Sequence, residues 1–358
     1  MSKSILLTGG AGFIGSNFVE IAVQAGHHVV VLDALTYAGH KENLDHLSGP
    51  GKMTFVQGQI QDQALVSKLL SEHQIDWLLN FAAESHVDKS ITGPAPFVDT
   101  NIVGTFHLLM AAKNYFDGLS GAKKANFRFL HVSTDEVFGT LGETGKFSET
   151  TAYQPNSPYS ASKAGSDLLV RAWYHTYHLP TIITNCSNNY GPKQFPEKLI
   201  PHMIMSALGG KKLPVYGDGK NIRDWIHVKD HARGVMLAVE KGKPGETYCF
   251  GGNSERTNLD VVKSISAELD RVRPMAGGKK YETMIEFVTD RPGHDFRYAI
   301  DDSKAQRELG FKREYANFEA GMKDTVAWYL AHLDWCKKVT SKPGVKMTYE
   351  WATIGGSR

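Results

Sequence analysis

The chain has 358 residues, of which 41% are hydrophobic and 22% charged, as is usual for a folded globular protein. This length exceeds one simple core and predicts two domains or one elaborated α/β domain. The formal net charge of +2 argues against a dedicated nucleic-acid surface, and no apolar run is long enough to span a membrane.

The N-terminus and the cysteines indicate a reducing compartment. The first residues carry one positive charge and lead directly into a short apolar segment, which does not fit a signal peptide. Cys186, Cys249 and Cys336 are far apart and form no Cys-x-x-Cys pair, and no His-Glu-x-x-His spacing occurs. We therefore expect a cytoplasmic protein with no bound metal.

Apolar segments alternate with helical patterns through the first half of the chain. The segments are continuous, as in strands buried on both faces of a parallel sheet, and they lie at residues 5–7, 29–32, 54–56, 77–79, 129–132 and 181–184. Apolar residues at helical spacing predict helices over 14–25 and 98–109, and a longer helix is expected from about 158 to 178.

Beyond Asn185, proline and glycine become frequent, which predicts a loop-rich region rather than a regular sheet. Segments 225–228 and 247–250 resemble strands on either side of a helix at about 230–240, and they are candidates to rejoin the first sheet. Helices near 258–270 and 318–333 are expected to complete a smaller domain.

A glycine-rich turn follows the first strand. Glycines at 9, 12 and 15 give Gly-x-x-Gly-x-x-Gly, and those at 10, 12 and 15 give Gly-x-Gly-x-x-Gly. Such a turn lets a pyrophosphate approach backbone N–H groups at a helix N-terminus. We predict the α/β class: a Rossmann doubly wound parallel sheet over residues 1–190, with 224–252 added. A smaller C-terminal α/β substrate-binding domain over 191–345 would be interleaved with it.

Asp33 ends the second predicted strand, eighteen residues beyond Gly15. A carboxylate here accepts hydrogen bonds from the adenosine ribose and repels a 2′-phosphate. The sequence therefore predicts NAD rather than NADP.

Tyr159 and Lys163 lie four residues apart at the start of the long predicted helix, so they share one face. A neighbouring ammonium would lower the pKa of the phenol. Tyr159 would then serve as a base on a substrate hydroxyl while hydride leaves to NAD.

These motifs together resemble the extended short-chain dehydrogenase/reductase superfamily. Within it, five further segments closely resemble the dTDP-glucose 4,6-dehydratase family. They are Ala-Ala-Glu-Ser-His-Val-Asp at 82–88, Ser-Thr-Asp-Glu-Val-Phe-Gly at 133–139, Asn-Cys-Ser-Asn-Asn-Tyr-Gly-Pro at 185–192, Arg-Asp-Trp at 223–225 and Asp-Arg-Pro-Gly-His-Asp at 290–295. The similarity runs from about residue 4 to about residue 335.

The resemblance implies a lyase that converts dTDP-glucose into dTDP-4-keto-6-deoxyglucose with tightly bound NAD. Tyr159 would take the O4 proton as the C4 hydride goes to NAD, with Thr134 bonded to O4 and Lys163 holding the nicotinamide ribose. Glu136 would remove the C5 proton and Asp135 would protonate the departing C6 hydroxyl, after which hydride returns to C6.

Asp135 and Glu136 directly follow a predicted strand, at the sheet edge where ligands of α/β folds bind. Neighbours in a strand point to opposite faces, so we expect the pair on a turn or helix start. Adjacent carboxylates repel, so one is expected to keep its proton near neutrality.

The resemblance also implies two sets of binding residues. The cofactor set is Gly9, Gly12, Phe13, Ile14, Gly15, Asp33, Ala34, Leu35, Thr36, Gln59, Ile60, Ala82, Ala83, Ser85, Thr100, Tyr159, Lys163 and Asn189. The substrate set is Ser85, His86, Asp88, Thr134, Asn188, Lys198, Leu199, Pro214, Tyr216, Arg223, Asn258, Arg291 and His294, with the two arginines on the phosphates.

Three residues depart from the family pattern. Gln59 replaces an expected aspartate at the adenine, which could weaken NAD binding slightly. Lys193 replaces an aromatic residue and Phe296 an arginine, in segments expected near the nucleotide, so thymine and uracil both stay open as the base.

Several alternatives stay open at this point. They are a UDP-glucose-type 4,6-dehydratase, a 4-epimerase of the same fold, which would need neither Asp135 nor Glu136, and a non-catalytic NAD-binding protein. The family also implies a homodimer that pairs the helices near 98–115 and 159–178, and a role in deoxysugar synthesis such as that of rhamnose for polysaccharides.

Overall fold

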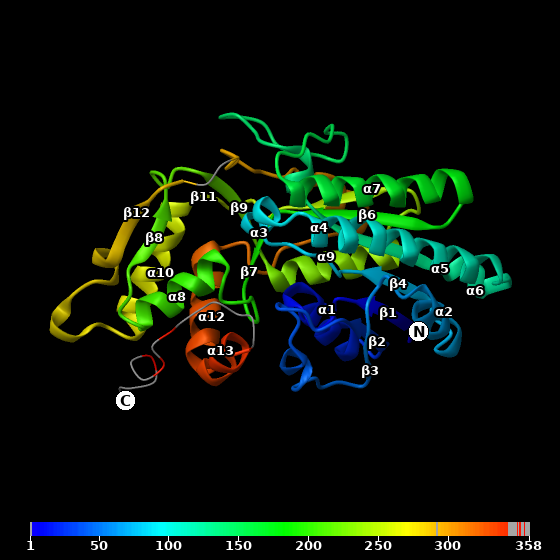
Figure 1. The fold of residues 1–358 in the computed structure, drawn as a ribbon, viewed down its shortest axis with the longest axis horizontal. Helices are drawn as coiled ribbons and strands as arrows, with labels where there is room; N and C mark the ends of the chain where they lie inside the picture. Colours follow the sequence, from blue (N-terminus) through cyan, green and yellow to red (C-terminus); the bar gives the residue numbers. More distant parts are fainter. Residues whose placement is uncertain (1, 291–292, 343–348, 350, 352–353, 355–358) are drawn as a thin grey trace.

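The computed structural model describes residues 2–290, 293–342, 349, 351 and 354. Within them, seven parallel strands form one sheet in the order β10-β6-β5-β4-β1-β2-β3. This is the doubly wound Rossmann arrangement that the sequence predicts (Figure 1). The strands are β1 Ser4–Thr8, β2 His28–Asp33, β3 Lys52–Gln57, β4 Trp77–Asn80, β5 Arg128–Thr134, β6 Thr181–Cys186 and β10 Thr247–Phe250.

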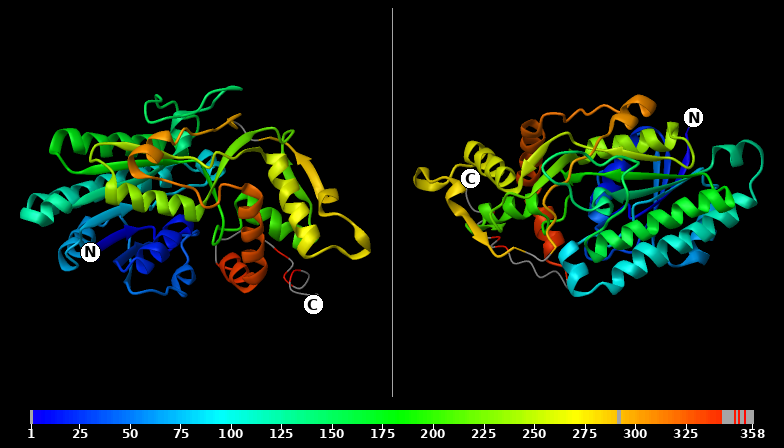
Figure 2. Two further views of the ribbon diagram at one scale, coloured as in Figure 1. Left: turned by 180° about the vertical axis from the view of Figure 1, so that it is seen from behind. Right: turned by 90° about the horizontal axis from the view of Figure 1, so that it is seen from above.

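Helices cover both faces of this sheet. On one face lie α1 (Phe13–Gln24), α9 (Val228–Lys241) and α11 (Ser303–Leu309), and on the other lie α2 (Gln63–Glu72), α5 (Thr105–Asp117) and α7 (Pro158–Tyr177). In Figure 2, α5 and α7 run side by side along the outer surface. The core strands are fully buried because apolar side chains from both helical layers pack on them.

A smaller unit lies beside the carboxyl ends of these strands. It contains the sheet β11-β9-β7 and the pair β12-β8, packed on α8, α10 and α12 around a separate hydrophobic cluster. The elements are β7 Asn188–Tyr190, α8 Leu199–Leu208, β8 Leu213–Tyr216, β9 Ile222–His227, β11 Glu255–Thr257, α10 Asn258–Val272, β12 Ile285–Val288, α12 Phe318–Ala331 and α13 Leu333–Thr340.

The shorter elements connect these units. They are α3 Val87–Thr92, α4 Ala95–Phe97, α6 Gly121–Asn126, the π-helix η2 Val98–Gly104, and the 3₁₀ turns η1 Lys41–Leu44, η3 Asp135–Phe138, η4 Ala276–Gly278 and η5 Tyr281–Met284. The helix expected over 98–109 is therefore π-helical in its first half and α-helical in its second.

One expectation for the second half is wrong, and another is incomplete. Segment 225–228 does not rejoin the first sheet, because β9 pairs with β7 and β11 and helix α9 already begins at Val228. The region just beyond Asn185 is rich in loops, as expected, but it also contains the buried helix α8, which was not predicted. Pro201 hides this helix in the sequence, but it lies in the first turn, where a missing N–H costs little.

No helix among the described residues is long and apolar enough to cross a membrane.

Candidate active site

The glycine-rich turn joins β1 to α1 at the centre of the sheet, where the strand order reverses. Gly9 has a φ of +70°, and a Cβ at this position would lie 2.7 Å from the backbone nitrogen of Ala82. A Cβ on Gly15 would lie 2.3 Å from the carbonyl oxygen of Gly9. Gly12 caps α1 without any side chain, so the first N–H groups of this helix stay open to an anion. The turn therefore fits a pyrophosphate group.

Asp33 lies at the end of β2, directly beside this turn. Its two carboxylate oxygens accept hydrogen bonds from the backbone nitrogens of Ala11 (2.9 Å) and Leu35 (2.8 Å). Burial raises the pKa of the Asp33 carboxyl, and these two hydrogen bonds oppose that rise. The contacts hold the carboxylate in place against the first cavity.

The first cavity has a volume of about 350 Å³ and runs along the carboxyl ends of the strands. Every residue of the expected cofactor set lines it except Leu35. Leu35 has a φ of +51°, and its side chain packs on the hydrophobic core under the sheet instead. The side chain of Leu35 therefore does not border the first cavity, and its place in the cofactor set stays a prediction.

Thr134 ends β5, and Asp135 and Glu136 begin the turn η3, so the two acids do lie on a turn. Thr134 Oγ1 accepts a hydrogen bond from the Glu136 backbone nitrogen (3.3 Å) and donates one to Asp135 Oδ1 (3.3 Å). Asn185, on the next strand, donates to the Thr134 carbonyl at 2.9 Å. These contacts direct both acids toward the first cavity, which they line.

Asp135 is buried, with 1% of its surface exposed. Burial raises the pKa of its carboxyl well above the usual value, and the charges of Glu136 and Asp224 raise it further. Asp135 therefore holds a proton more firmly than an ordinary aspartate. Burial is the main cause of this raised pKa, and repulsion by the neighbouring Glu136, which the sequence suggests, is second.

Tyr159 and Lys163 occupy the first turns of α7, which a reciprocal pair of hydrogen bonds between Ser157 and Ser160 caps. The expected lowering of the tyrosine pKa is wrong for the chain by itself. Burial raises the pKa of Tyr159 well above its usual value, and the charge of Glu136 adds to this. The Lys163 ammonium donates to the Val132 carbonyl at 2.9 Å, so it is held against β5 rather than against the phenol.

A second cavity of about 780 Å³ opens beside the first, between the two units. Every residue of the expected substrate set lines it except Thr134, which lines only the first cavity, and Arg291, which lies outside the described residues. Glu136 lines both cavities and thus lies where they meet.

Three residues expected near the nucleotide, Arg223, Lys193 and Phe296, make contacts other than those expected. Arg223 lines the second cavity, but its guanidinium donates to the carbonyls of Ile222 and Asp295 and lies 4.2 Å from the ring centre of Tyr298. Lys193 lines neither cavity, because its ammonium lies 3.2 Å from Glu20 of α1. Phe296 also lines neither cavity. The two departures are therefore not placed to choose the base.

One group at the entrance between the cavities was missed from the sequence. Glu197 pairs with Lys89 at 2.9 Å, and the Lys89 ammonium lies 3.5 Å from the ring centre of Tyr37. Tyr37 and Glu197 line both cavities. Each group directly follows or precedes a residue of the predicted sets, but only the fold, which brings two loops and helix α3 together here, shows that they meet.

Within the described residues, no group of three or more His, Cys, Asp or Glu side chains is placed to hold a metal ion.

Comparison with known proteins agrees with this geometry. Over residues 6–325 the chain matches the family described as GDP-mannose 4,6 dehydratase. It is 60% identical over 334 residues to the dTDP-glucose 4,6-dehydratase of Xanthomonas campestris pv. campestris (strain B100), an alignment that covers 93% of this chain and 95% of the relative.

Solved structures show the same similarity. The dTDP-glucose 4,6-dehydratase of Bacillus anthracis, in complex with NAD, is 44% identical with a TM-score of 0.83, covering 94% of this chain and 100% of that one. The enzyme of the same name from Streptomyces venezuelae, with NAD and TYD bound, is 41% identical with a TM-score of 0.83, covering 94% and 99%. The chain therefore belongs to the dTDP-glucose 4,6-dehydratase family.

Proposed function

We propose that this protein is an NAD-dependent lyase that converts dTDP-glucose into dTDP-4-keto-6-deoxyglucose. The observation that carries the proposal is the position of Glu136, which borders both cavities beside a buried, proton-retaining Asp135. An acid and a base side by side suit the loss of water across two adjacent carbons. A 4-epimerase of this fold would use neither group.

The first cavity would hold NAD. The open N-terminus of α1 would bind the pyrophosphate, Asp33 the adenosine ribose and Lys163 the nicotinamide ribose. When bound, NAD would supply a positively charged ring, an acceptor for the C4 hydride and, once reduced, a source of hydride for C6. Gln59 also lines this cavity and retains an acceptor for the adenine amino group.

Tyr159 would take the proton from the O4 hydroxyl as C4 becomes a ketone. A hydrogen bond from the Thr134 hydroxyl would lower the pKa of Tyr159 and favour the phenolate, provided that Thr134 turns its hydrogen from Asp135 to the phenol. Since burial raises that pKa, the phenolate also depends on positive charge brought into the cavity with the cofactor.

The C4 ketone makes the C5 proton acidic, and Glu136 would remove it. Asp135 would give its proton to the C6 hydroxyl, so that water leaves and a C5–C6 double bond forms. Once C6 has been reduced, Glu136 returns its proton to C5, giving the 4-keto-6-deoxy sugar. Each proton taken or given then belongs to a named side chain.

The second cavity would hold the nucleotide sugar. Its polar lining includes Asn188, Lys198, Arg223 and Asn258, and its apolar lining includes Trp225. Arg223 would serve the diphosphate only if the charge of the ligand competes with the backbone carbonyls that it now contacts.

Mass analysis of the product tests the proposal. Purified protein with dTDP-glucose should yield a product lighter by one water, whereas an epimerase would leave the mass unchanged and a binding protein would leave the substrate unchanged. A panel of dTDP-, UDP- and GDP-glucose should show dTDP-glucose turned over most efficiently. Equal or better turnover of UDP-glucose would instead assign a UDP-glucose-type dehydratase.

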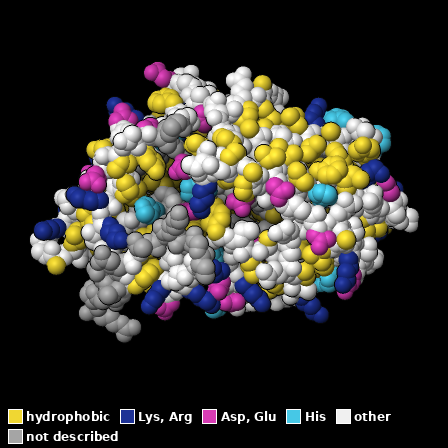
Figure 3. Space-filling view, viewed as in Figure 1, with side chains coloured by type: hydrophobic (Ala, Val, Ile, Leu, Met, Phe, Trp, Pro, Cys, Tyr) yellow, Lys and Arg dark blue, Asp and Glu magenta, His cyan; other side chains and the backbone are white. Residues whose placement is uncertain are grey.

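We also propose a homodimer that pairs α5 and α7 with those of a second copy. Exposed apolar side chains gather there, over the region where these helices lie in Figure 1, as Figure 3 shows. They are Val98, Val103, Phe106, Leu168 and Tyr177. Contiguous apolar surface of this kind is typical of protein interfaces.

Light scattering tests the dimer. Leu168→Glu should give a monomer, while the matched control Phe287→Glu should stay dimeric, because both side chains are 57% exposed but Phe287 lies on β12, in the other unit. A wild-type monomer would overturn the proposal.

Two coarser proposals follow from the fold. Residues 1–190, together with α9 and β10, would bind NAD, and the remainder of 191–345 would bind the substrate, because separate hydrophobic clusters underlie the two parts.

The three cysteines are buried and free, which supports a reducing, cytoplasmic location. Cell fractionation would check the location.

A further inference from the structure

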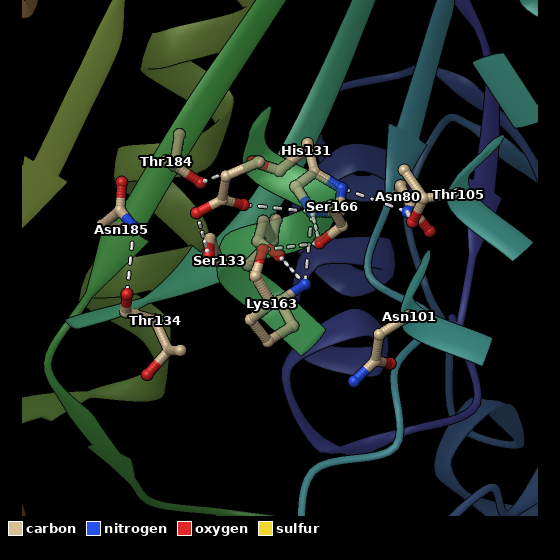
Figure 4. Close-up of polar contacts among 12 residues, drawn as sticks. Asn80, Asn101, Thr105, His131, Ser133, Thr134, Lys163, Ser166, Thr184 and Asn185 are labelled. Atoms are coloured by element: carbon tan, nitrogen blue, oxygen red, sulfur yellow. Dashed lines mark hydrogen bonds and ion pairs between the residues drawn. The ribbon is translucent and has the colours of Figure 1, made fainter. Parts of the chain in front are cut away.

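A chain of buried polar groups lies directly beneath Lys163. Figure 4 shows His131 between Asn80 on one side and Lys163 and Ser166 on the other. The ring nitrogen Nε2 of His131 lies 3.3 Å from the Lys163 ammonium and 3.1 Å from Ser166 Oγ. The other ring nitrogen, Nδ1, lies 3.1 Å from the Asn80 amide nitrogen. His131 and Lys163 are both buried.

The neighbouring hydrogen bonds decide which nitrogen of His131 carries the proton. Thr8 Oγ1 accepts from the Ala82 backbone nitrogen and donates its own hydrogen to Asn80 Oδ1, 2.6 Å away. The Asn80 NH₂ group must then face His131 Nδ1, which can only accept. The proton is then on Nε2 and points to Ser166 Oγ, so the 3.3 Å approach of the Lys163 ammonium to this nitrogen is not a hydrogen bond.

His131 is therefore uncharged, and its ring lies beside the Lys163 ammonium without carrying an opposing charge. Burial lowers its pKa to about 4, and the Lys163 charge lowers it further. Its Nε2–H donates to Ser166 Oγ, whose own hydrogen goes to the Lys163 carbonyl at 2.8 Å. A neutral ring that already donates cannot offset the charge of the Lys163 ammonium.

Asp167, one turn beyond Lys163 on α7, carries the opposite charge. Its Oδ2 accepts hydrogen bonds from Ser133 Oγ (2.7 Å) and the Tyr153 hydroxyl (3.1 Å), and its Oδ1 lies 3.4 Å from His131 Nε2. Its charge opposes the fall in the Lys163 pKa that burial causes. Cys186 acts in the same direction only as a thiolate, and burial raises the pKa of that thiol, which keeps it neutral.

We propose that Asp167 is a positioning residue that acts through Lys163: the buried carboxylate, spaced from the ammonium by the His131 ring, supplies the negative charge that keeps the lysine charged and in place. The inference rests on the proposed function for what Lys163 does to the cofactor ribose and to Tyr159. The charge relation between Asp167 and Lys163 stands apart from that function: both groups contact His131 Nε2, at 3.4 Å and 3.3 Å, and the Asp167 charge opposes the fall in the Lys163 pKa.

A double-mutant cycle on the NAD-loaded protein tests the charge relation without using activity. Asp167→Asn and Lys163→Met each leave one buried charge without its partner, so each should lower the melting temperature. The double variant leaves neither charge and should melt no lower than the less stable single variant. If Asp167→Asn does not fold, recovery of folding in the double variant supports the inference. Additive losses, or no recovery, would overturn it.

Kinetics provides the second measurement. Asp167→Asn should lower kcat at least tenfold while the KM for dTDP-glucose changes less than twofold, because the carboxylate lies behind Lys163 and does not line the second cavity. In the Lys163→Met background the same substitution should change residual kcat less than threefold. An equal loss in both backgrounds would refute action through Lys163.

A control variant removes a carboxylate elsewhere, and separate outcomes bear on this inference and on the proposed function. Glu282→Gln removes an exposed carboxylate that lies 3.5 Å from the Lys263 ammonium of α10, away from both cavities and from the proposed interface, and it should change neither melting temperature nor kcat. A wild-type protein that forms no product would count against the proposed function, whereas additive stability losses would count against this inference alone.

Discussion

Replacing Asp135 by asparagine separates proton donation from charge. Asp135 is buried, and its pKa is raised first by burial and then by the charges of Glu136 and Asp224. A protonated carboxyl and a carboxamide have nearly the same shape, so the asparagine side chain should fit the space. The carboxamide cannot protonate the leaving C6 hydroxyl, and loss of a general acid lowers kcat by about 10²- to 10⁴-fold. Binding of NAD and of the nucleotide sugar should persist.

The same substitution should change the pH dependence of stability. The folded-state pKa of Asp135 lies above its unfolded value of about 3.9. Between these two pH values the unfolded chain has released the proton that the folded chain keeps. The free energy of unfolding of the wild type therefore falls as the pH rises, by about 1.4 kcal/mol per pH unit. The carboxamide of Asp135→Asn has no such proton, so the variant should gain stability relative to the wild type as the pH rises from 5 toward 7.

Urea unfolding of both proteins at pH 5 and pH 7, at equal protein and NAD concentration, measures this gain. Product formation from dTDP-glucose at saturation measures kcat. A stability difference that is the same at both pH values would refute the claim that folded Asp135 keeps its proton. A variant with wild-type kcat would refute its role as the acid.

Three other substitutions test the remaining parts of the site. Glu136→Gln should abolish exchange of the C5 proton with solvent while NAD stays bound, and exchange at the wild-type rate would argue against Glu136 as the base. Tyr159→Phe should prevent C4 oxidation, so stopped-flow absorbance after mixing with substrate should show no reduced cofactor; its formation at the wild-type rate would contradict the role. Gly15→Ala should lower the NAD content and reduce the free energy of unfolding by about 1–3 kcal/mol, because the new Cβ would lie 2.3 Å from a backbone oxygen. The control is Gly118→Ala, where the nearest atom to the new Cβ is 3.5 Å away. An equal loss of stability in both variants would refute the steric explanation.

The parts of the fold that the sequence predicts well are those set by local chemistry. The strand, glycine turn and helix at residues 4–24 follow from apolar runs and from positions that only glycine tolerates. Helix α7 follows from its serine cap and from Pro158 in its first turn. Helix α8 escapes prediction because Pro201 disrupts the pattern in sequence but not in structure.

Side-chain direction is the part that local chemistry leaves open. Lys193 was expected near the nucleotide, yet its φ of +71° and its contact with Glu20 turn it toward α1. Arg223 lies in the expected cavity, but Ile222 and Asp295 carbonyls already hold its guanidinium. Both outcomes depend on residues far away in the sequence, which no spacing rule connects to them.

Contacts that depend on the fold also explain why the pKa of Tyr159 differs from the sequence-based expectation. From the sequence, Lys163 is the only obvious partner of Tyr159, and a lower phenol pKa follows from that pair alone. In the fold, the Lys163 ammonium donates a hydrogen bond to the Val132 carbonyl of β5. Burial and the charge of Glu136 raise the pKa of the Tyr159 phenol. A buried phenol beside a carboxylate resists ionisation until positive charge enters the cavity. In the proposed mechanism Tyr159 would therefore become an active base mainly when a cationic ring is present, which would tie oxidation at C4 to a loaded first cavity.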